Sequence, residues 1–156
     1  MINNLLEILT VQNVYLFANW GVIPFWILLI FLPNHVLTNI FVHSIIIPLI
    51  LALAYIFFAY NIFLEGNMLD SFELYQGLDG LYSMFANEIF LLIFWLHFLA
   101  LSLFLGSWIS RDSLKYNIPK FLTAIFLILT YFTGPVGLLA FWLVRIFFAK
   151  KINFND

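Results

Sequence analysis

Residues 89–109 form a run of twenty-one residues without a charged side chain. A helix of that length is about 31 Å long at 1.5 Å per residue, which matches the roughly 30 Å hydrocarbon core of a bilayer. Residues 8–64 also lack Asp, Glu, Lys and Arg, and 65% of the chain is apolar whereas 9% is charged. A soluble domain of 156 residues has too small an interior for that much apolar surface. The chain is therefore predicted to be an integral membrane protein.

Apolar runs separated by Pro, Gly and charged residues predict an all-α membrane protein, a compact bundle of four transmembrane helices. Residues 1–156 are predicted to form a single integral membrane domain. Its spans are expected at about residues 14–32, 40–64, 89–109 and 120–149. The connection between helices 2 and 3 is acidic, and apolar residues recur in it at helical spacing. This predicts a short interfacial segment containing Leu78, Leu81, Tyr82 and Phe85, with a solvated acidic loop as the alternative.

An even number of spans places both termini and the acidic connection on one side of the membrane. The basic residues then divide equally, with Arg145, Lys150 and Lys151 beside the acidic connection and Arg111, Lys115 and Lys120 opposite it. Equal numbers give no preference under the positive-inside rule, so the orientation is left open. The chain has no basic residue before Arg111, which argues against a secretory signal or an organelle transit peptide. We expect an integral protein of a bacterial inner (cytoplasmic) membrane.

His97 lies inside the third apolar run, where an ionisable side chain is costly and is by default a candidate for function. At the helical rise it lies roughly 12 Å below the acidic side of the membrane. Polar or helix-breaking residues of other spans reach a similar depth, and they predict one inward-facing polar layer, the expected pocket. They include Asn19, Trp20, Thr133, Gly134 and Pro135.

Each of these residues also has a structural interpretation. His97 could donate to a carbonyl of a neighbouring helix, including one that a proline leaves without its usual N–H. Ser102 and Gly106 are four residues apart, a spacing that favours close helix packing. His43 differs in depth from His97 by roughly 15 Å, so the two cannot share one metal ion or clamp one haem. No metal site is predicted.

Four blocks of the sequence carry a family resemblance. They are Ala18-Asn19-Trp20-Gly21-Val22-Ile23-Pro24-Phe25-Trp26, Trp95-Leu96-His97-Phe98-Leu99-Ala100, Gly106-Ser107-Trp108-Ile109 with Arg111-Asp112, and Thr133-Gly134-Pro135-Val136-Gly137-Leu138-Leu139 with Arg145. In this order they resemble the abscisic acid-deficient four family of neoxanthin synthase-like membrane proteins, and the chain is similar to its bacterial members. Plant members of the family act in forming neoxanthin from violaxanthin.

The resemblance implies a protein that modifies a carotenoid of the xanthophyll type, as an isomerase that opens an epoxide by acid-base chemistry without redox. In this hypothesis His97 is the catalytic proton donor or acceptor. The substrate-binding residues are Trp20 and Trp95, which stack on the polyene, and Asn19, Ser102 and Thr133, which bond a ring oxygen, beside Gly134 and Pro135. Ser102 stands where the family pattern has an Asp, and a serine cannot act as an acid at ordinary pH.

The alternative is a non-catalytic membrane subunit that binds a pigment or docks onto a larger membrane complex. No redox cofactor is predicted, and a bound carotenoid or other lipid-soluble pigment is the expected ligand. The expected partners are the lipid bilayer, the polyene ligand, and other membrane subunits or further copies of the chain. No nucleic acid partner is predicted, because the chain has no basic nucleic-acid-binding surface. Asp112 and Glu88 are the other titratable candidates, each also explained as a water-facing charge.

Overall fold

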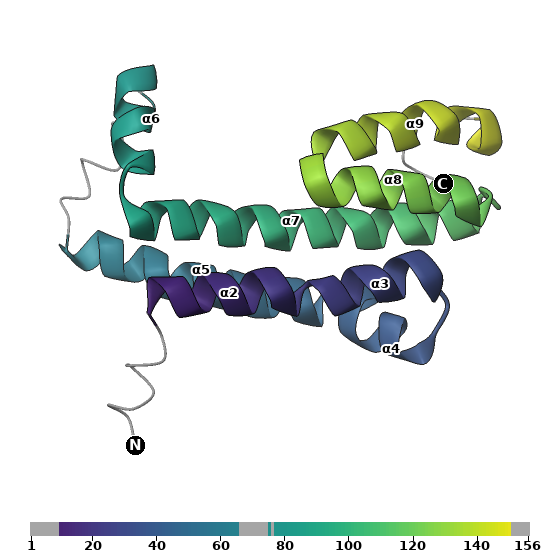
Figure 1. Cartoon of the computed structure of the whole chain (residues 1–156). Helices are drawn as coiled ribbons and strands as arrows, with labels where there is room; N and C mark the ends of the chain where they lie inside the picture. The colour runs from purple at the N-terminus through teal and green to yellow at the C-terminus, as the bar shows by residue number, and fades with distance from the viewer. Residues whose placement is uncertain (1–9, 66–74, 76, 151–156) are drawn as a thin grey trace. The chain divides into compact units, whose positions relative to one another are not determined.

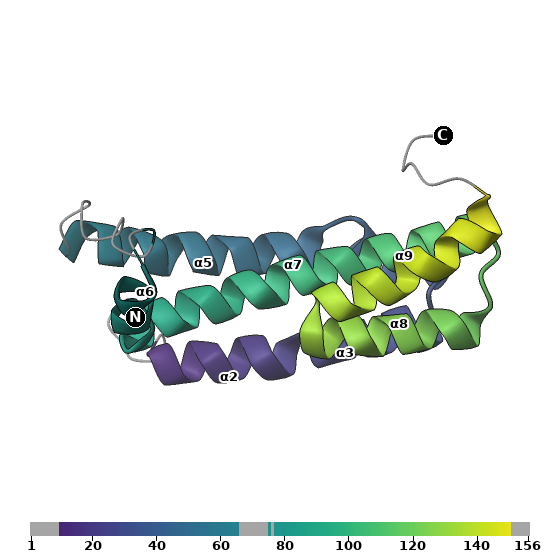
Figure 2. The same ribbon diagram turned by 90° about the horizontal axis from the view of Figure 1, so that it is seen from above.

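The computed structural model describes residues 10–65, 75 and 77–150, and within them it contains helices and connections but no strand. The helices are α2 (Val11–Gly21), α3 (Ile23–Phe31), α4 (Val36–Thr38), the π-helix η1 (Asn39–His43), α5 (Ile46–Glu65), α6 (Leu78–Phe85), α7 (Glu88–Lys115), α8 (Lys120–Thr133) and α9 (Pro135–Ala149). Figures 1 and 2 show them from two directions. The predicted all-α class is confirmed.

Among the residues that the structure describes, three apolar helical segments are long enough to cross a membrane, namely Val11–Phe31, Val36–Ile62 and Glu88–Lys115. They correspond to the first three predicted spans and support a membrane protein. The chain divides into two compact units. The first unit comprises Met1–Gly21 and Leu49–Ala100, and the second comprises Val22–Pro48 and Leu101–Asp156.

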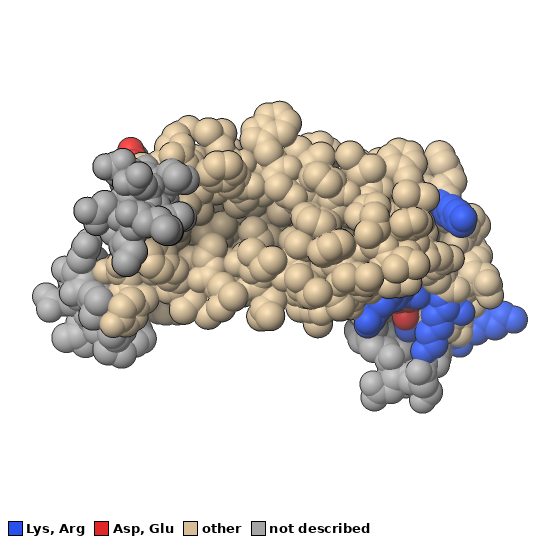
Figure 3. All heavy atoms as spheres, turned by 90° about the horizontal axis from the view of Figure 1, so that it is seen from below, with Lys and Arg blue, Asp and Glu red and all other residues tan. Residues whose placement is uncertain are grey.

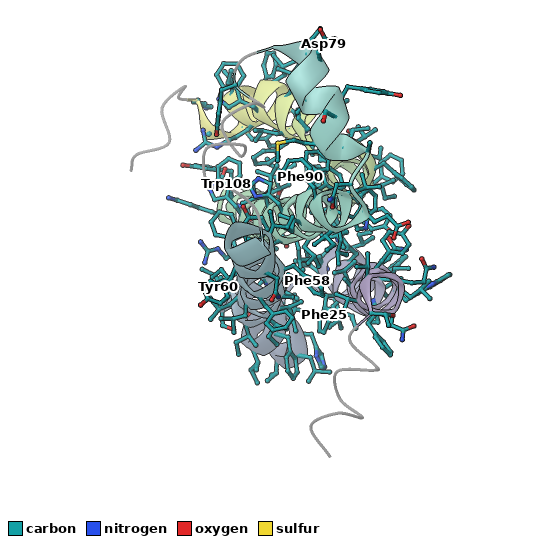
Figure 4. All side chains as sticks on the ribbon, turned by 90° about the vertical axis from the view of Figure 1, so that its left-hand side faces the viewer. Phe25, Phe58, Tyr60, Asp79, Phe90 and Trp108 are labelled. Atoms are coloured by element: carbon teal, nitrogen blue, oxygen red, sulfur yellow. The ribbon has the colours of Figure 1, made fainter. Side chains whose placement is uncertain are left out.

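The first unit contains α2, most of α5, α6 and the first half of α7. Its buried side chains are mostly aliphatic, because each helix turns one stripe inward and leaves the other apolar residues on the outside. On α5, for example, Phe58 is buried whereas Tyr60 is exposed, and the view along the helices in Figure 4 labels both. Exposed apolar residues on the outer face are what a helix in contact with lipid should have.

The predicted interfacial segment contains the short helix α6. Its Leu78 and Tyr82 are 83% and 81% exposed, whereas Phe85 packs its ring against those of Phe90 and Phe94 on α7, at centroid distances of 5.4 and 4.8 Å. This arrangement leaves an apolar face of α6 that no described residue covers, as an interfacial helix requires. The rest of the acidic connection, residues 66–74 and 76, lies outside the described residues.

The single fourth span expected over residues 120–149 is not observed, because this segment forms two helices, α8 and α9. Their lengths of 14 and 15 residues correspond to about 21 and 22 Å, which is shorter than the hydrocarbon core. Between them Gly134 has φ 59° and ψ −82°, a backbone conformation that L side chains rarely adopt. The Gly134-Pro135 pair, predicted to lie inside one continuous span, therefore reverses the chain.

The reversal makes α8 and α9 an antiparallel hairpin, and Figures 1 and 2 both show the two helices side by side. The ring of Phe141 on α9 contacts Phe126 on α8 and Trp108 on α7, at 5.9 and 5.3 Å between centroids. One turn further along α9, Arg145 reaches Asp112 on α7. The helix α9 therefore runs parallel to α7 and ends beside the end of α7.

This geometry corrects the predicted distribution of charge. Arg145 was expected on the side of the acidic connection, opposite Arg111, but it pairs with Asp112, the next residue to Arg111. Lys150 directly follows the end of α9 and lies at the same end of the second unit. Lys151 is outside the described residues. The equal division of basic residues assumed a continuous fourth span, and it fails because that helix turns back.

A glycine allows α3 to approach α7 closely within the second unit. A Cβ built on Gly106 would lie 2.7 and 2.8 Å from two ring atoms of Trp26. We expect Gly106→Ala to lower the free energy of unfolding in detergent by about 1–3 kcal/mol, because the buried indole must move to make room. Gly21→Ala is the matched control, since a Cβ at this helical glycine meets nothing within 4 Å and should be tolerated. Equal stability of the Gly106→Ala variant and the wild type would contradict the close approach.

Candidate functional site

The predicted site residues are distributed between the two units. Asn19, Trp20, Trp95 and His97 belong to the first unit, whereas Ser102, Thr133, Gly134 and Pro135 belong to the second. Trp20 is 66% exposed. Ser102 is buried, and the exposed Thr133 donates its hydroxyl to the carbonyl of Leu129 at 2.7 Å, within its own helix. These placements do not test the predicted polar layer, which stays a prediction.

His97 and Trp95 lie on different sides of α7. Two residues of helix separate them by about 200° around its axis. The exposed imidazole of His97 lies against Tyr55 of α5, with 5.9 Å between ring centroids. The ring of Trp95 instead lies 6.1 Å from Tyr15 of α2. The two residues that the sequence placed in one pocket therefore contact different helices.

A groove of about 520 Å³ lies between α2 and the first half of α7, all within the first unit. This volume is within the range of small-molecule sites. The lining residues are Val11, Gln12, Tyr15, Glu88, Leu91, Leu92 and Trp95. They come from the first turns of both helices, so α2 and α7 run in the same direction beside the groove.

The inner part of the groove is aromatic and aliphatic. Trp95 stacks on Phe98 at 5.4 Å and contacts Tyr15, which holds the indole in place. The Nε1 atom of Trp95 is buried and has no hydrogen-bond partner among the residues that the structure describes. The indole therefore offers carbon atoms rather than its N–H to the groove.

The mouth of the groove is polar because both helices begin there. The side chain of Asn87 accepts hydrogen bonds from the backbone N–H groups of Ile89 and Phe90, at 2.9 and 3.1 Å, and so caps α7. This cap places the exposed Glu88 in the first turn, where the helix dipole favours a negative charge. Gln12 lies in the first turn of α2. From Glu88 to Trp95 the groove extends about 10 Å along α7.

The second unit contains a hydrogen-bonded imidazole that the sequence analysis set aside. His43 ends the π-helix η1, and its Nε2 donates to the carbonyl of Pro33 at 3.2 Å. That carbonyl can only accept, so in the neutral ring Nδ1 accepts the hydroxyl proton of Ser107 at 2.9 Å. The bond fixes η1 against α7, and Ile45, two residues further along the chain, has φ 68°. His43 thus has the helix-joining role that was weighed for His97.

Arg145 forms the other polar centre of the second unit. It is fully buried, pairs with Asp112, and lies over the ring of Tyr116 at 4.8 Å from the centroid. The sequence contained a signal for this pair. Arg145 is the one charged residue between positions 121 and 149, and Asp112 is the one acid between positions 89 and 155. A charge buried in apolar surroundings is costly without a partner of opposite sign, so two such isolated charges are expected to pair.

The comparisons with known proteins agree with the resemblance. The profile of a family described as ABA DEFICIENT 4-like matches residues 13–141. Neither the curated proteins nor the solved structures contain a match to the chain. The matched region includes most of α2, all of α7, most of the α8–α9 hairpin and all groove residues except Val11 and Gln12. Because it covers well over half of the sequence, the chain belongs to the ABA DEFICIENT 4-like family.

Proposed function

We propose that this protein binds an oxygenated carotenoid in the groove between α2 and α7 and isomerises it. The observation that carries the proposal is the composition of the groove, which has an aromatic and aliphatic interior and a polar mouth. Family membership supports the same class of ligand. The proposed location is a bacterial inner membrane, from which the ligand would enter the groove sideways.

The groove suits one end of a xanthophyll. A polyene is flat and apolar, so it packs favourably on Trp95, Tyr15 and the aliphatic residues beside them. Oxygen atoms on the end ring need polar partners and prefer the membrane interface, where Gln12 and Glu88 lie in the first turns of their helices. Aromatic contacts would thus hold the polyene of the ligand, and the polar residues at the mouth would orient its end ring.

The proposed reaction converts an epoxide into an allene and a hydroxyl group. The epoxide oxygen gains a proton as its C–O bond breaks, and a neighbouring polyene carbon loses a proton, so atoms and electrons balance without a redox partner. Glu88 is the carboxyl group in the groove lining and is the proposed proton carrier there. His97, the carrier predicted from the sequence, contacts Tyr55 on the other side of α7. Both residues enter the test below.

Pigment retention tests the binding step. The protein is purified in detergent from a host that makes violaxanthin, and bound pigment is quantified by visible absorbance per mole of protein. We expect Trp95→Ala to reduce retention about tenfold, since an aromatic contact contributes on the order of 1–2 kcal/mol. Trp95→Phe should keep most of it. Tyr60→Ala is the control, because Tyr60 is exposed and lies outside the groove lining. Equal retention in Trp95→Ala and wild type would exclude the groove as the site.

Pigment chromatography of the same host tests the reaction. In wild type we expect a new isomer of the supplied xanthophyll. Glu88→Gln should retain pigment but lose at least about 100-fold in product formation, the usual scale for loss of acid-base catalysis. Loss of product in His97→Ala with an active Glu88→Gln variant would instead favour the prediction from the sequence. Retained pigment without product in the wild type would favour the non-catalytic pigment-binding subunit.

A further inference from the structure

The described basic residues gather at one end of the second unit. In Figure 3 most of the blue Lys and Arg atoms gather about a red carboxylate, and one blue group lies apart from them. Four of the basic residues, Arg111, Lys115, Lys120 and Lys150, are exposed. The fifth, Arg145, is buried in its pair with Asp112 and so adds little to the surface charge.

The hairpin produces this concentration of charge. If α8 and α9 formed one continuous helix, Lys150 would end on the far side of the membrane from Lys120. Because Gly134 reverses the chain, α9 returns to the end of α7 and brings Lys150 back to that end. The surface therefore depends on the fold of the second unit and not on sequence order.

We propose that the basic end of the second unit docks on anionic phospholipid headgroups of the cytoplasmic leaflet. Basic residues next to membrane spans are retained on the cytoplasmic side, and anionic lipids there attract Lys and Arg. This docking is independent of the proposed function, because it involves no residue of the groove.

Single-cysteine labelling tests the orientation, and the chain suits it because it contains no cysteine. The two variants are Pro119→Cys between α7 and α8 and Lys150→Cys after α9. With a membrane-impermeant maleimide, we expect neither variant to react on intact spheroplasts and both to react after permeabilisation. Labelling of Pro119→Cys from outside would overturn the orientation, and opposite sidedness of Pro119→Cys and Lys150→Cys would overturn the shared basic end.

Lipid retention tests the docking separately. The protein is extracted from membranes containing phosphatidylglycerol, and the bound lipid is measured by native mass spectrometry. Replacing the four exposed basic residues with Gln should lower retained phosphatidylglycerol about tenfold or more and leave phosphatidylcholine unchanged. Unchanged phosphatidylglycerol would overturn the docking proposal. Carotenoid retention should stay at the wild-type level in this variant, so a failure here is distinguishable from a failure of the groove.

Discussion

The variant Arg145→Met is expected to lose about 3 kcal/mol or more of unfolding free energy in detergent. Removing one partner of a buried ion pair leaves the other charge without compensation, which typically costs 3–5 kcal/mol. Arg145 is fully buried and Asp112 is mostly buried, so the remaining carboxylate has little access to water. The cation over the ring of Tyr116 is lost as well. Chemical or thermal unfolding followed by circular dichroism measures the change.

Two further variants identify the cause of that loss. Lys150→Met removes an exposed positive charge just beyond α9 and should cost less than about 0.5 kcal/mol. The double variant Asp112→Asn/Arg145→Met removes both charges and should recover a measurable part of the stability. Arg145→Lys should not reach the wild-type free energy of unfolding, because an ammonium group lacks the planar, forked donor geometry of the guanidinium. If Arg145→Met matched Lys150→Met in stability, the buried pair would not hold α9 against α7.

The second large effect is expected for Gly137→Ala in α9. A Cβ at this position would overlap the hydroxyl and backbone nitrogen of Thr130 and lie 2.6 Å from its Cα. Main-chain atoms of a helix cannot move aside as a flexible side chain can, so α8 and α9 must separate. We expect a loss of about 3 kcal/mol or more, at the upper end of overpacking effects. Thermal unfolding of the purified protein in detergent provides the measurement.

The predicted clash is mainly with main-chain atoms of Thr130 and not only with its side chain, and a second variant tests this. Thr130→Ala removes the hydroxyl but leaves the backbone nitrogen and Cα in place. The double variant Thr130→Ala/Gly137→Ala should therefore remain nearly as unstable as Gly137→Ala alone. Recovery of wild-type stability in the double variant would show that the helices are farther apart than the structure places them.

The sequence predicted those parts of the fold that depend on the absence of charge. Three long apolar segments follow from long runs without an ionised residue, because such runs are stable only in lipid or in a large core. The short helix α6 follows from apolar residues at helical spacing in an acidic segment. Both are local properties, so they can be inferred without knowledge of packing.

The hairpin could not be predicted in the same way. A Gly-Pro pair inside an apolar run permits either a kink or a reversal, and the outcome depends on the dihedral angles at Gly134 and on the fit of Gly137 against Thr130. The predicted charge distribution was wrong for the same reason, because a continuous fourth span would place Arg145 on the opposite side of the membrane from Asp112. The pairing of Arg145 with Asp112 could have been predicted, because both are isolated charges in apolar surroundings.

The candidate site was predicted in part. Trp95 lies in the lining of the groove, but the depth argument that grouped it with His97 ignored the direction of the side chains around α7. Residues at one depth can still face different helices. Glu88 was interpreted as a water-facing charge, and its position at the mouth of the groove depends on the parallel packing of α2 and α7, which sequence spacing does not contain.

Protection of a cysteine in the groove tests the central claim most directly. Leu91→Cys places the single thiol of the chain in the lining, at a leucine that is 48% exposed. Tyr60→Cys on α5, at a tyrosine that is 58% exposed and outside the lining, is the control. Alkylation rates are measured in detergent with the carotenoid bound and after it is removed. Bound pigment should slow the alkylation of the cysteine in Leu91→Cys about tenfold, because a ligand that fills the groove excludes the reagent. The alkylation rate of Tyr60→Cys should not change. Equal rates at Leu91→Cys with and without bound pigment would contradict the assignment of the groove as the carotenoid site.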